Sequence, residues 1–235
     1  MIIDDVIEQI RRNRISTTEV ADALGKSGVL PGMQAVTPDL HRVGPIHPIF
    51  AAGGSNHGVH VALPDVQAGE VAVVFTDGCE GRAVFGDLMA KYALLYRDAA
   101  AMVSVGLVRD AARLRRERYA VWSHGFSPLG CVNQFTEPFP EDRQQSLVED
   151  YRGGVAVCDD GGVVLIPGRQ VTEDLVERLQ RIELQEDVWY YCLDTLKWDT
   201  KRIVCDREYL TASDALPPAY REALAVLERR FESME

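Results

Sequence analysis

The middle of the chain constrains the fold most, because short strand-like and helical segments alternate there. Residues 71–75 are predicted to form a buried strand, and residues 100–108 form a second run of small, apolar side chains. Helical segments are predicted at 88–96 and 111–118, followed by a strand-like segment at 119–122. This alternation is typical of an α/β domain.

The N-terminal part adds helices and one more predicted strand. Residues 2–12 place apolar side chains at helical spacing. Ser16 and Glu19 then have the form of a capping box, which predicts that a second helix opens there. Residues 59–63 alternate between apolar and polar side chains, as a short strand does, and residues 76–85 are predicted to form a loop.

The C-terminal part begins with a hairpin and continues as helix. Asp159-Asp160-Gly161-Gly162 separates two apolar runs, and these residue types tolerate the positive φ of a tight turn. Helical spacing starts at Val171, and the last predicted helix covers residues 218–232. We expect residues 1–185 to form the main domain, with residues 186–235 as a helical extension packed on the same domain.

Composition narrows the possible partners. The 235 residues include 36 acidic and 25 basic ones, and the net charge of −11 argues against binding nucleic acid or an anionic membrane. No apolar run approaches the roughly 20 residues that span a bilayer, and the N-terminus lacks a basic leader region. The five cysteines are scattered without a CxxC motif, which favours reduced thiols in a cytoplasmic protein.

Two short motifs carry the residues best suited to chemistry. Gly86 stands where a loop enters a helix, a position that offers free backbone N–H groups to a carboxylate or phosphate. Arg109 and Asp110 follow the apolar run 100–108. The arginine suits a carboxylate or an enolate, and the aspartate, pointing the other way on an extended chain, suits a hard divalent cation. Taken alone, these residues are more often an ordinary helix cap and a solvated ion pair than a functional site.

Six segments stand in a distinctive order and spacing along the chain: 16–25, 64–71, 86–90, 106–110, 119–128 and 159–167. Each segment alone is a weak signal. Together, over residues 14–185, they resemble the RraA-like family, which includes 4-hydroxy-4-methyl-2-oxoglutarate aldolase and the regulator of ribonuclease E.

The resemblance implies a three-layer β/β/α swivelling-domain fold, a homotrimer or hexamer with sites between subunits, and a metal-dependent lyase of the class II aldolase or decarboxylase type. Such an enzyme cleaves a 4-hydroxy-2-oxo acid, or decarboxylates an oxaloacetate-like acid, through pyruvate enolate. Arg109 and Asp110 would be catalytic, and Asp110 would hold Mg²⁺ or Mn²⁺. The pyruvate end of the substrate would bind to the backbone or side chains of Gly86, Asp87, Leu88, Met89 and Arg109.

Some positions depart from the family pattern. The interval between Asp87 and Arg109 is one residue longer than usual, and we expect residues 96–100 to absorb the difference. Val105 stands where an aspartate is common, and His124 stands where an arginine is common. The aromatic-rich segment after Glu186 matches nothing in the family.

Two alternatives stay open. The first is a non-enzymatic regulator, although such members lack the intact Arg-Asp pair that this chain retains. The second is an enzyme of a specialised pathway that reuses the pyruvate and metal site. The pair His57 and His60 is interpreted as surface, and Glu183 and Glu186 are candidates to approach a neighbouring subunit's site.

Overall fold

The computed structural model describes residues 1–232. The chain forms two compact units, Met1–Leu175 and Val176–Glu235, with the boundary inside one long helix. We call them the sheet unit and the helical unit and consider each by itself.

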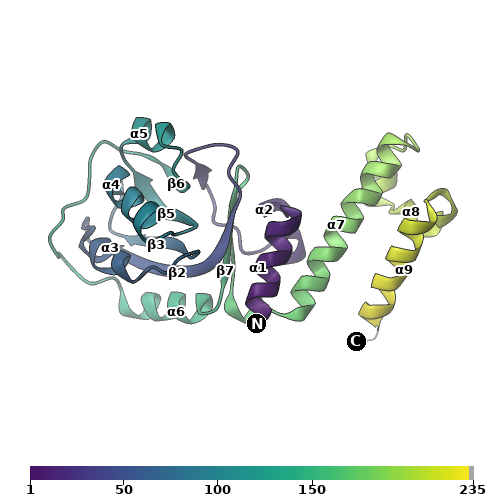
Figure 1. Cartoon of the computed structure of the whole chain (residues 1–235), viewed down its shortest axis with the longest axis horizontal. Helices are drawn as coiled ribbons and strands as arrows, with labels where there is room; N and C mark the ends of the chain where they lie inside the picture. The colour runs from purple at the N-terminus through teal and green to yellow at the C-terminus, as the bar shows by residue number, and fades with distance from the viewer. Residues whose placement is uncertain (233–235) are drawn as a thin grey trace. The chain divides into compact units, whose positions relative to one another are not determined.

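The sheet unit contains the strands and helices that alternate along the first three quarters of the chain (Figure 1). Its strands are β1 (Gln34–Ala35), β2 (Arg42–Ala52), β3 (Val71–Asp77), β4 (Ala83–Phe85), β5 (Ala101–Val108), β6 (Val121–Phe126), β7 (Val155–Asp159) and β8 (Gly162–Ile166). Its helices are α1 (Ile2–Asn13), α2 (Thr17–Ala23), α3 (His57–Ala62), α4 (Asp87–Lys91), the π-helix η2 (Tyr92–Tyr96), α5 (Ala111–Arg116), α6 (Glu141–Tyr151) and the start of α7 (Glu173–Asp194).

The strands follow the order β1-β6-β5-β3-β2-β7-β8, and β4 pairs with β5 beside this path. Strand β2 belongs to two sheets. Its first residues, 42–45, run antiparallel to β7, whereas residues 46–52 run parallel to β3. The parallel strands β3, β5 and β6 therefore continue through β2 into the antiparallel β7-β8 hairpin.

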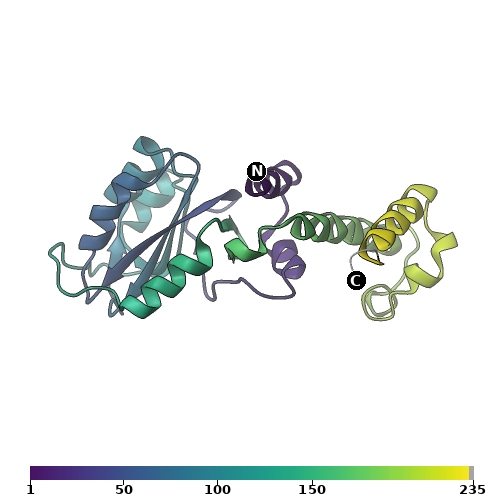
Figure 2. The ribbon, with the colours of Figure 1, turned by 90° about the horizontal axis from the view of Figure 1, so that it is seen from below.

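Both faces of the parallel sheet are covered, as all-parallel strands require. Side chains alternate across β3, so Val74 packs with Met89 of α4 and Leu114 of α5 on one face. Val73 packs on the other face with Leu165 of the hairpin. Helices α3, α4 and α5 lie on one side of the strands in both ribbon views (Figure 1, Figure 2). The result is the expected α/β fold of three layers, with helices, parallel sheet and hairpin in turn.

Several local predictions are confirmed. The capping box of α2 has both arms, since Ser16 Oγ accepts from the Glu19 N–H at 3.2 Å and the Ser16 N–H donates to Glu19 Oε2 at 2.7 Å. The hairpin turn is present, because Asp159 of β7 pairs with Gly162 of β8. The last helix, α9, covers Pro218–Glu232 as predicted.

Two predictions are wrong. Residues 59–63 lie mostly in α3 rather than in a strand, because only Val59 and Leu63, four residues apart, are buried, whereas Val61 is exposed. That spacing is helical, and the apparent alternation came from counting Val61 as buried. The predicted loop 76–85 also contains strand β4.

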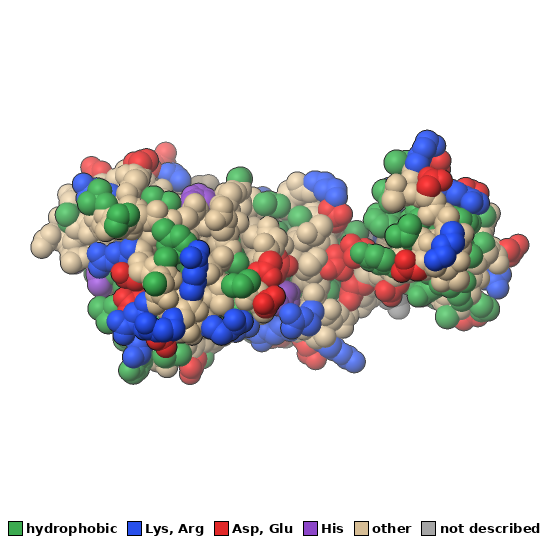
Figure 3. All heavy atoms as spheres, turned by 90° about the horizontal axis from the view of Figure 1, so that it is seen from above, with side chains coloured by type: hydrophobic (Ala, Val, Ile, Leu, Met, Phe, Trp, Pro, Cys, Tyr) green, Lys and Arg blue, Asp and Glu red, His purple; other side chains and the backbone are tan. Residues whose placement is uncertain are grey.

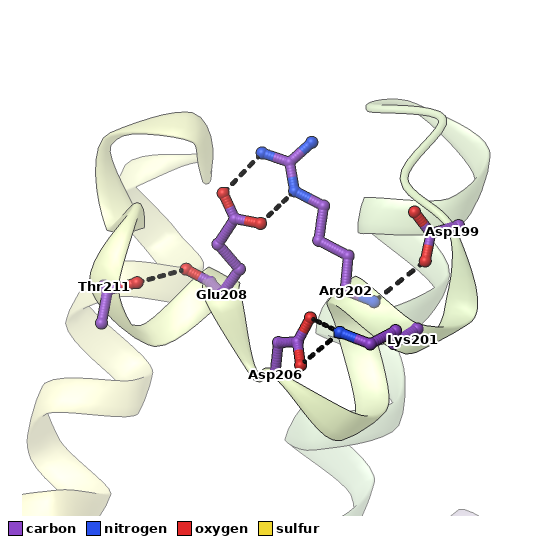
Figure 4. A network of polar contacts seen from close by, with 6 residues as sticks. All are labelled: Asp199, Lys201, Arg202, Asp206, Glu208 and Thr211. Atoms are coloured by element: carbon purple, nitrogen blue, oxygen red, sulfur yellow. Dashed lines mark hydrogen bonds and ion pairs between the residues drawn. The ribbon is translucent and has the colours of Figure 1, made fainter.

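The helical unit comprises the rest of α7, the π-helix η4 (Lys201–Cys205), α8 (Glu208–Thr211), the 3-10 helix η5 (Ser213–Ala215) and α9 (Pro218–Glu232). It has its own core, which includes Val188, Cys192 and Tyr209. Figure 4 shows its polar network, in which Arg202 and Glu208 form a two-bonded ion pair. No helix among residues 1–232 is both long and apolar enough to cross a membrane.

Candidate functional site at the ends of β4 and β5

The two motifs singled out from the sequence lie side by side. Strands β4 and β5 are parallel, and Phe85 pairs with Val108, the last residue of each strand. The next residues, Gly86 and Arg109, therefore leave the sheet at the same edge. The Arg109 N–H donates to the Phe85 carbonyl at 3.0 Å, which fixes the register at this point.

Asp110 turns the chain sharply from β5 into α5. Its φ of 62° and ψ of 35° lie in the left-handed region, which aspartate tolerates better than most residues. The expectation that Arg109 and Asp110 point opposite ways on an extended chain is therefore wrong. Asp110 Oδ2 lies 3.6 Å from Arg109 Nε and accepts a hydrogen bond from the Asp87 N–H at 3.2 Å.

Position 86 requires glycine because the side chains of Asp110 and Arg109 lie too close to it for a Cβ, not because of its backbone conformation. Its φ of −139° suits any residue. A Cβ at this position, however, would lie 2.0 Å from Asp110 Oδ2 and 2.9 Å from Arg109 Cγ. Only a residue without a side chain lets the loop meet both groups.

Asp87 and Arg113 form an ion pair that the sequence analysis missed. Arg113 Nε lies 3.0 Å from Asp87 Oδ2, and the Asp87 side chain is only 20% exposed. Arg113 follows Asp110 by three residues on the first turn of α5, where i and i+3 side chains share a face. No local spacing links Arg113 to Asp87, so no pattern in the sequence indicated this pair. The edge therefore carries two arginines, Arg109 and Arg113, each beside a carboxylate.

The segment after β6 packs against Arg109. A Cβ on Gly130 would lie 2.6 Å from Arg109 Nη1, so this glycine too gives the guanidinium room. The segment is anchored at its start, where the Ser127 N–H donates to the Val108 carbonyl at 3.0 Å. The backbone at Gly130 therefore borders one side of the Arg109 guanidinium.

The groups at this edge are accessible to a small ligand. The side chains of Arg109 and Asp110 are 51% and 38% exposed. Leu88 is exposed, whereas Met89 is buried in the core, so Met89 offers only its backbone to the edge. Gly86 caps α4 without a side chain, and N–H groups in the first turn of a helix have no acceptor within that helix.

The donor set fits a cation that keeps much of its water. Among residues 1–232, no three histidine, cysteine, aspartate or glutamate side chains gather as a metal cage. Asp110 nevertheless presents an accessible carboxylate, and only its Oδ2 is engaged by groups in the described part of the chain. Mg²⁺ binds proteins in this way, through one or two carboxylates and several waters.

The other candidate residues lie elsewhere in the sheet unit or on α7. His60 is exposed on α3, and the ring of His57 packs edge-on against Phe135. The His124 Nε2–H donates a hydrogen bond to the Pro31 carbonyl, 3.0 Å away. Glu183 and Glu186 lie on α7 in the helical unit. Basic side chains gather in patches on the face shown in Figure 3, interspersed with acidic ones.

Solved structures with a similar fold come from several bacteria. An uncharacterised protein from Pseudomonas syringae pv. tomato matches with a TM-score of 0.64 and 22% identity, over 82% of this chain and 89% of that one. Streptomyces coelicolor RraAS2, an unusual member of the RNase ES inhibitor RraA family, matches with a TM-score of 0.60 and 20% identity, over 78% and 95%. The RNA-processing inhibitor RraA from Thermus thermophilis matches with a TM-score of 0.51 and 22% identity, over 64% and 92%. At these identities the likeness is one of fold.

The family follows from the sequence itself. The family model RraA-like, described as Aldolase/RraA, matches residues 17–165, which is more than half of the 235-residue chain. That span contains β4, β5 and every residue of the candidate site from Gly86 to Arg113. The protein belongs to the RraA-like family, whose members include both aldolases and inhibitors of ribonuclease E.

Proposed function

We propose that the protein is a divalent-metal-dependent carbon–carbon lyase that acts on 2-oxo acids through pyruvate enolate. The observation that carries this proposal is the meeting of Arg109, Asp110 and the Gly86 loop at one edge of the sheet. Family membership supports it, because the family includes aldolases and this chain has the adjacent Arg-Asp pair.

The carboxylate of the 2-oxo acid binds to the first turn of α4 and to Arg109. The Leu88 and Met89 N–H groups are free of helical acceptors, and the helix N-terminus favours an anion. Arg109 adds a planar fork that can hold two oxygens at once. The Asp87 N–H is engaged by Asp110 instead, so Asp87 positions the metal-binding carboxylate and the neighbouring Arg113.

Asp110 is the residue that would hold Mg²⁺ or Mn²⁺. Its left-handed backbone and its bond to the Asp87 N–H fix where the carboxylate lies. A divalent ion bound there would supply Lewis acidity toward the 2-oxo oxygen. Asp110 also lies beside Arg109. A metal ion held by Asp110 and the Arg109 guanidinium would therefore both face the same part of the substrate.

The chemical demand on the protein is to stabilise an enolate. When the bond between C3 and C4 of the substrate breaks, its electron pair moves to C3 and negative charge develops on the C2 oxygen. Arg109 meets that charge with fixed N–H donors, and one such donor typically contributes on the order of 3 kcal/mol to lowering the barrier. An aldol substrate must also lose its 4-hydroxyl proton, whereas an oxaloacetate-like acid loses CO₂ without that step.

We also propose that copies of the chain assemble through the face next to this site. Exposed apolar side chains gather on α3, α4 and η2, around a groove of about 480 Å³. A contiguous apolar surface on a protein usually marks an interface. Leu88, Tyr92 and Tyr96 line the groove, and Val61 and Leu95 are further exposed apolar side chains on α3 and η2. Leu88 belongs to the candidate loop, so a neighbouring subunit seated here would border the site, as a trimer or hexamer of this family would arrange it.

Pyruvate release tests the lyase. With Mg²⁺ or Mn²⁺, the protein should release pyruvate from oxaloacetate or from a 4-hydroxy-2-oxo diacid, and a chelator should abolish the release reversibly. Arg109→Lys and Asp110→Asn should each lower turnover about a hundredfold or more, since each removes a stabilising group. Arg116→Lys is the matched control, because Arg116 is exposed at the end of α5, the helix that follows the site, and pairs with its neighbour Glu117 among described residues.

The outcomes distinguish the rival functions. Metal-dependent turnover that both site variants lose, and that the control retains, supports the lyase. Absence of turnover from metal-loaded wild type on a panel of such acids would reject it and favour a non-enzymatic role like that of the RNase inhibitors in the family. Turnover unaffected by either variant would place the chemistry elsewhere.

A further inference from the structure

Two cysteines far apart in the sequence meet beside the candidate site. Cys79 follows β3, and Cys131 lies in the segment after β6, yet both belong to the same hydrophobic cluster. The Cys131 thiol donates a hydrogen bond to the Cys79 sulfur, and both cysteines are free thiols.

The backbone holds this pair together from both sides. The Cys131 N–H donates to the Ala83 carbonyl at 3.0 Å, and the Arg82 N–H donates to the Cys79 carbonyl at 3.1 Å. On the other side the next residue, Val132, donates to the Gly54 carbonyl at 2.9 Å. The backbone therefore brings the two cysteines into the same neighbourhood of the fold.

The two thiols differ in acidity. The hydrogen bond from Cys131 is the main reason that the pKa of Cys79 falls to about 7, and the Gly54 N–H lowers it further against the opposing effects of burial and Glu80. The same hydrogen bond, with burial, raises the pKa of Cys131, and Arg82 offsets only part of that rise. Cys79 is thus the thiolate of the pair and Cys131 its proton donor, a division typical of reactive dithiols.

The remaining cysteines have different surroundings. Cys158 is wholly buried in β7, and burial raises the pKa of its thiol. Cys192 is buried in the core of the helical unit, where burial likewise raises its pKa. Cys205 is exposed on η4 in that unit.

We propose that Cys79 and Cys131 form a redox-active dithiol that a small peroxide closes to a reversible disulfide. This inference stands apart from the lyase, because it rests on the thiol pair alone. Cys131 follows Gly130, whose backbone lies against Arg109, so the modification takes place one residue from the candidate site.

The reaction balances with hydrogen peroxide as the oxidant. The Cys79 thiolate attacks one peroxide oxygen, the O–O bond breaks, and the departing hydroxide takes up the proton that Cys79 had released, giving water and a sulfenic acid. The Cys131 sulfur then attacks the sulfenic sulfur, an S–S bond forms, the S–O bond breaks, and the Cys131 proton leaves with the hydroxyl as a second water. Each sulfur loses one electron, and the peroxide gains both.

Size favours a peroxide over a bulky disulfide oxidant. Cys79 is only 6% exposed, and Cys131 is partly buried. Hydrogen peroxide is little larger than water and needs no groove, whereas glutathione disulfide must bring a sulfur of its own into line with the attacking thiolate. We therefore expect the pair to respond to peroxide much faster than to glutathione disulfide.

Mass spectrometry of the full-length protein tests the proposal. Wild-type protein is treated with hydrogen peroxide, alkylated and cut with trypsin, which leaves each cysteine in a different peptide. We expect one cross-linked pair, residues 43–82 with residues 119–143, at a mass lower by two hydrogen atoms, and its loss on treatment with dithiothreitol. Cross-links confined to Cys205, or oxidation of Cys79 to sulfinic acid without any cross-link, would overturn the proposal.

Substitutions then separate the two roles. Cys131→Ser removes the resolving thiol but keeps a small polar side chain, so dimedone should trap the sulfenic acid at Cys79. Cys79→Ser should leave Cys131 unoxidised under the same conditions, and Cys205→Ser is the control that should retain the cross-link. Circular dichroism on each variant checks folding. A folded Cys131→Ser protein that peroxide leaves unmodified at Cys79 would reject the reaction order.

Discussion

Substituting Gly86 with alanine perturbs the candidate site at its tightest contact. A Cβ there would lie 2.0 Å from Asp110 Oδ2, about 1.4 Å short of the 3.4 Å at which ordinary contacts begin. It would also lie 2.9 Å from Arg109 Cγ. The backbone of Gly86 is extended and accepts alanine without strain, so the whole effect should come from displacing these two side chains.

The expected cost in stability is small and the expected cost in turnover is large. Asp110 is 38% exposed and can swing into water, losing its bond to the Asp87 N–H at about 1 kcal/mol. That corresponds to a fall in Tm of about 2–4 °C for a domain of this size. Misplacing catalytic groups by about 1 Å can lower a rate about a hundredfold. Pyruvate release and differential scanning calorimetry measure the two effects on the same sample.

A double-mutant cycle with Asp110→Ala checks the cause. Once the Asp110 carboxylate is gone, most of the clash is gone too, so adding Gly86→Ala should lower Tm less than it does in wild type. Equal losses of Tm in both backgrounds would show that alanine clashes with something other than Asp110. A Gly86→Ala protein with wild-type turnover and wild-type Tm would refute the close approach itself.

Three further outcomes are expected. Peroxide oxidation of Cys79, followed by stopped-flow thiol consumption, should accelerate about tenfold per pH unit below about 7 and then level off, because only the thiolate reacts; a flat profile would contradict the lowered pKa. Leu95→Glu should shift light scattering from an oligomer toward a monomer, since it charges the exposed apolar face; an unchanged mass would place the interface elsewhere. Ser16→Ala should cost about 1 kcal/mol and lower Tm by about 2–4 °C, because both arms of the capping box are present; an unchanged Tm would show that the cap contributes nothing.

The parts of the fold that the sequence predicts are those with local signals. Apolar runs marked β3 and β5, and the acidic and glycine residues of 159–162 marked the hairpin. Strand β2 was missed because Pro45 and Pro48 lie inside it, and proline argues against a central strand. Proline lacks a backbone N–H, so neither Pro45 nor Pro48 can donate a hydrogen bond to a neighbouring strand. Strand β2 still forms, because it pairs with β3 along one part of its length and with β7 along another.

In the candidate site, too, some features have a local signal in the sequence and others depend on the three-dimensional fold. Residue types and motif order pick out Arg109 and Asp110, because a cation next to an anion after an apolar run is a local pattern. The left-handed turn at Asp110, the clash-free approach of Gly86 and the ion pair of Asp87 with Arg113 depend on how two strand ends meet in space. Strand β4 has only three residues, too few for a pattern to reveal that meeting.

We expected residues 96–100 to absorb the extra residue between the two motifs, but the irregular turn in the structure lies earlier, at Tyr92–Tyr96. The resemblance implies one more residue than usual between Asp87 and Arg109, and the helix that follows Asp87 contains the π-helix Tyr92–Tyr96. In that turn the Arg97 N–H donates to the Tyr92 carbonyl, five residues back, whereas an α-helix spans four. A π turn therefore takes up one residue without changing what comes before or after it. We interpret this turn as the reason that Phe85 still pairs with Val108, and that the Gly86 loop still meets Arg109, despite the longer interval.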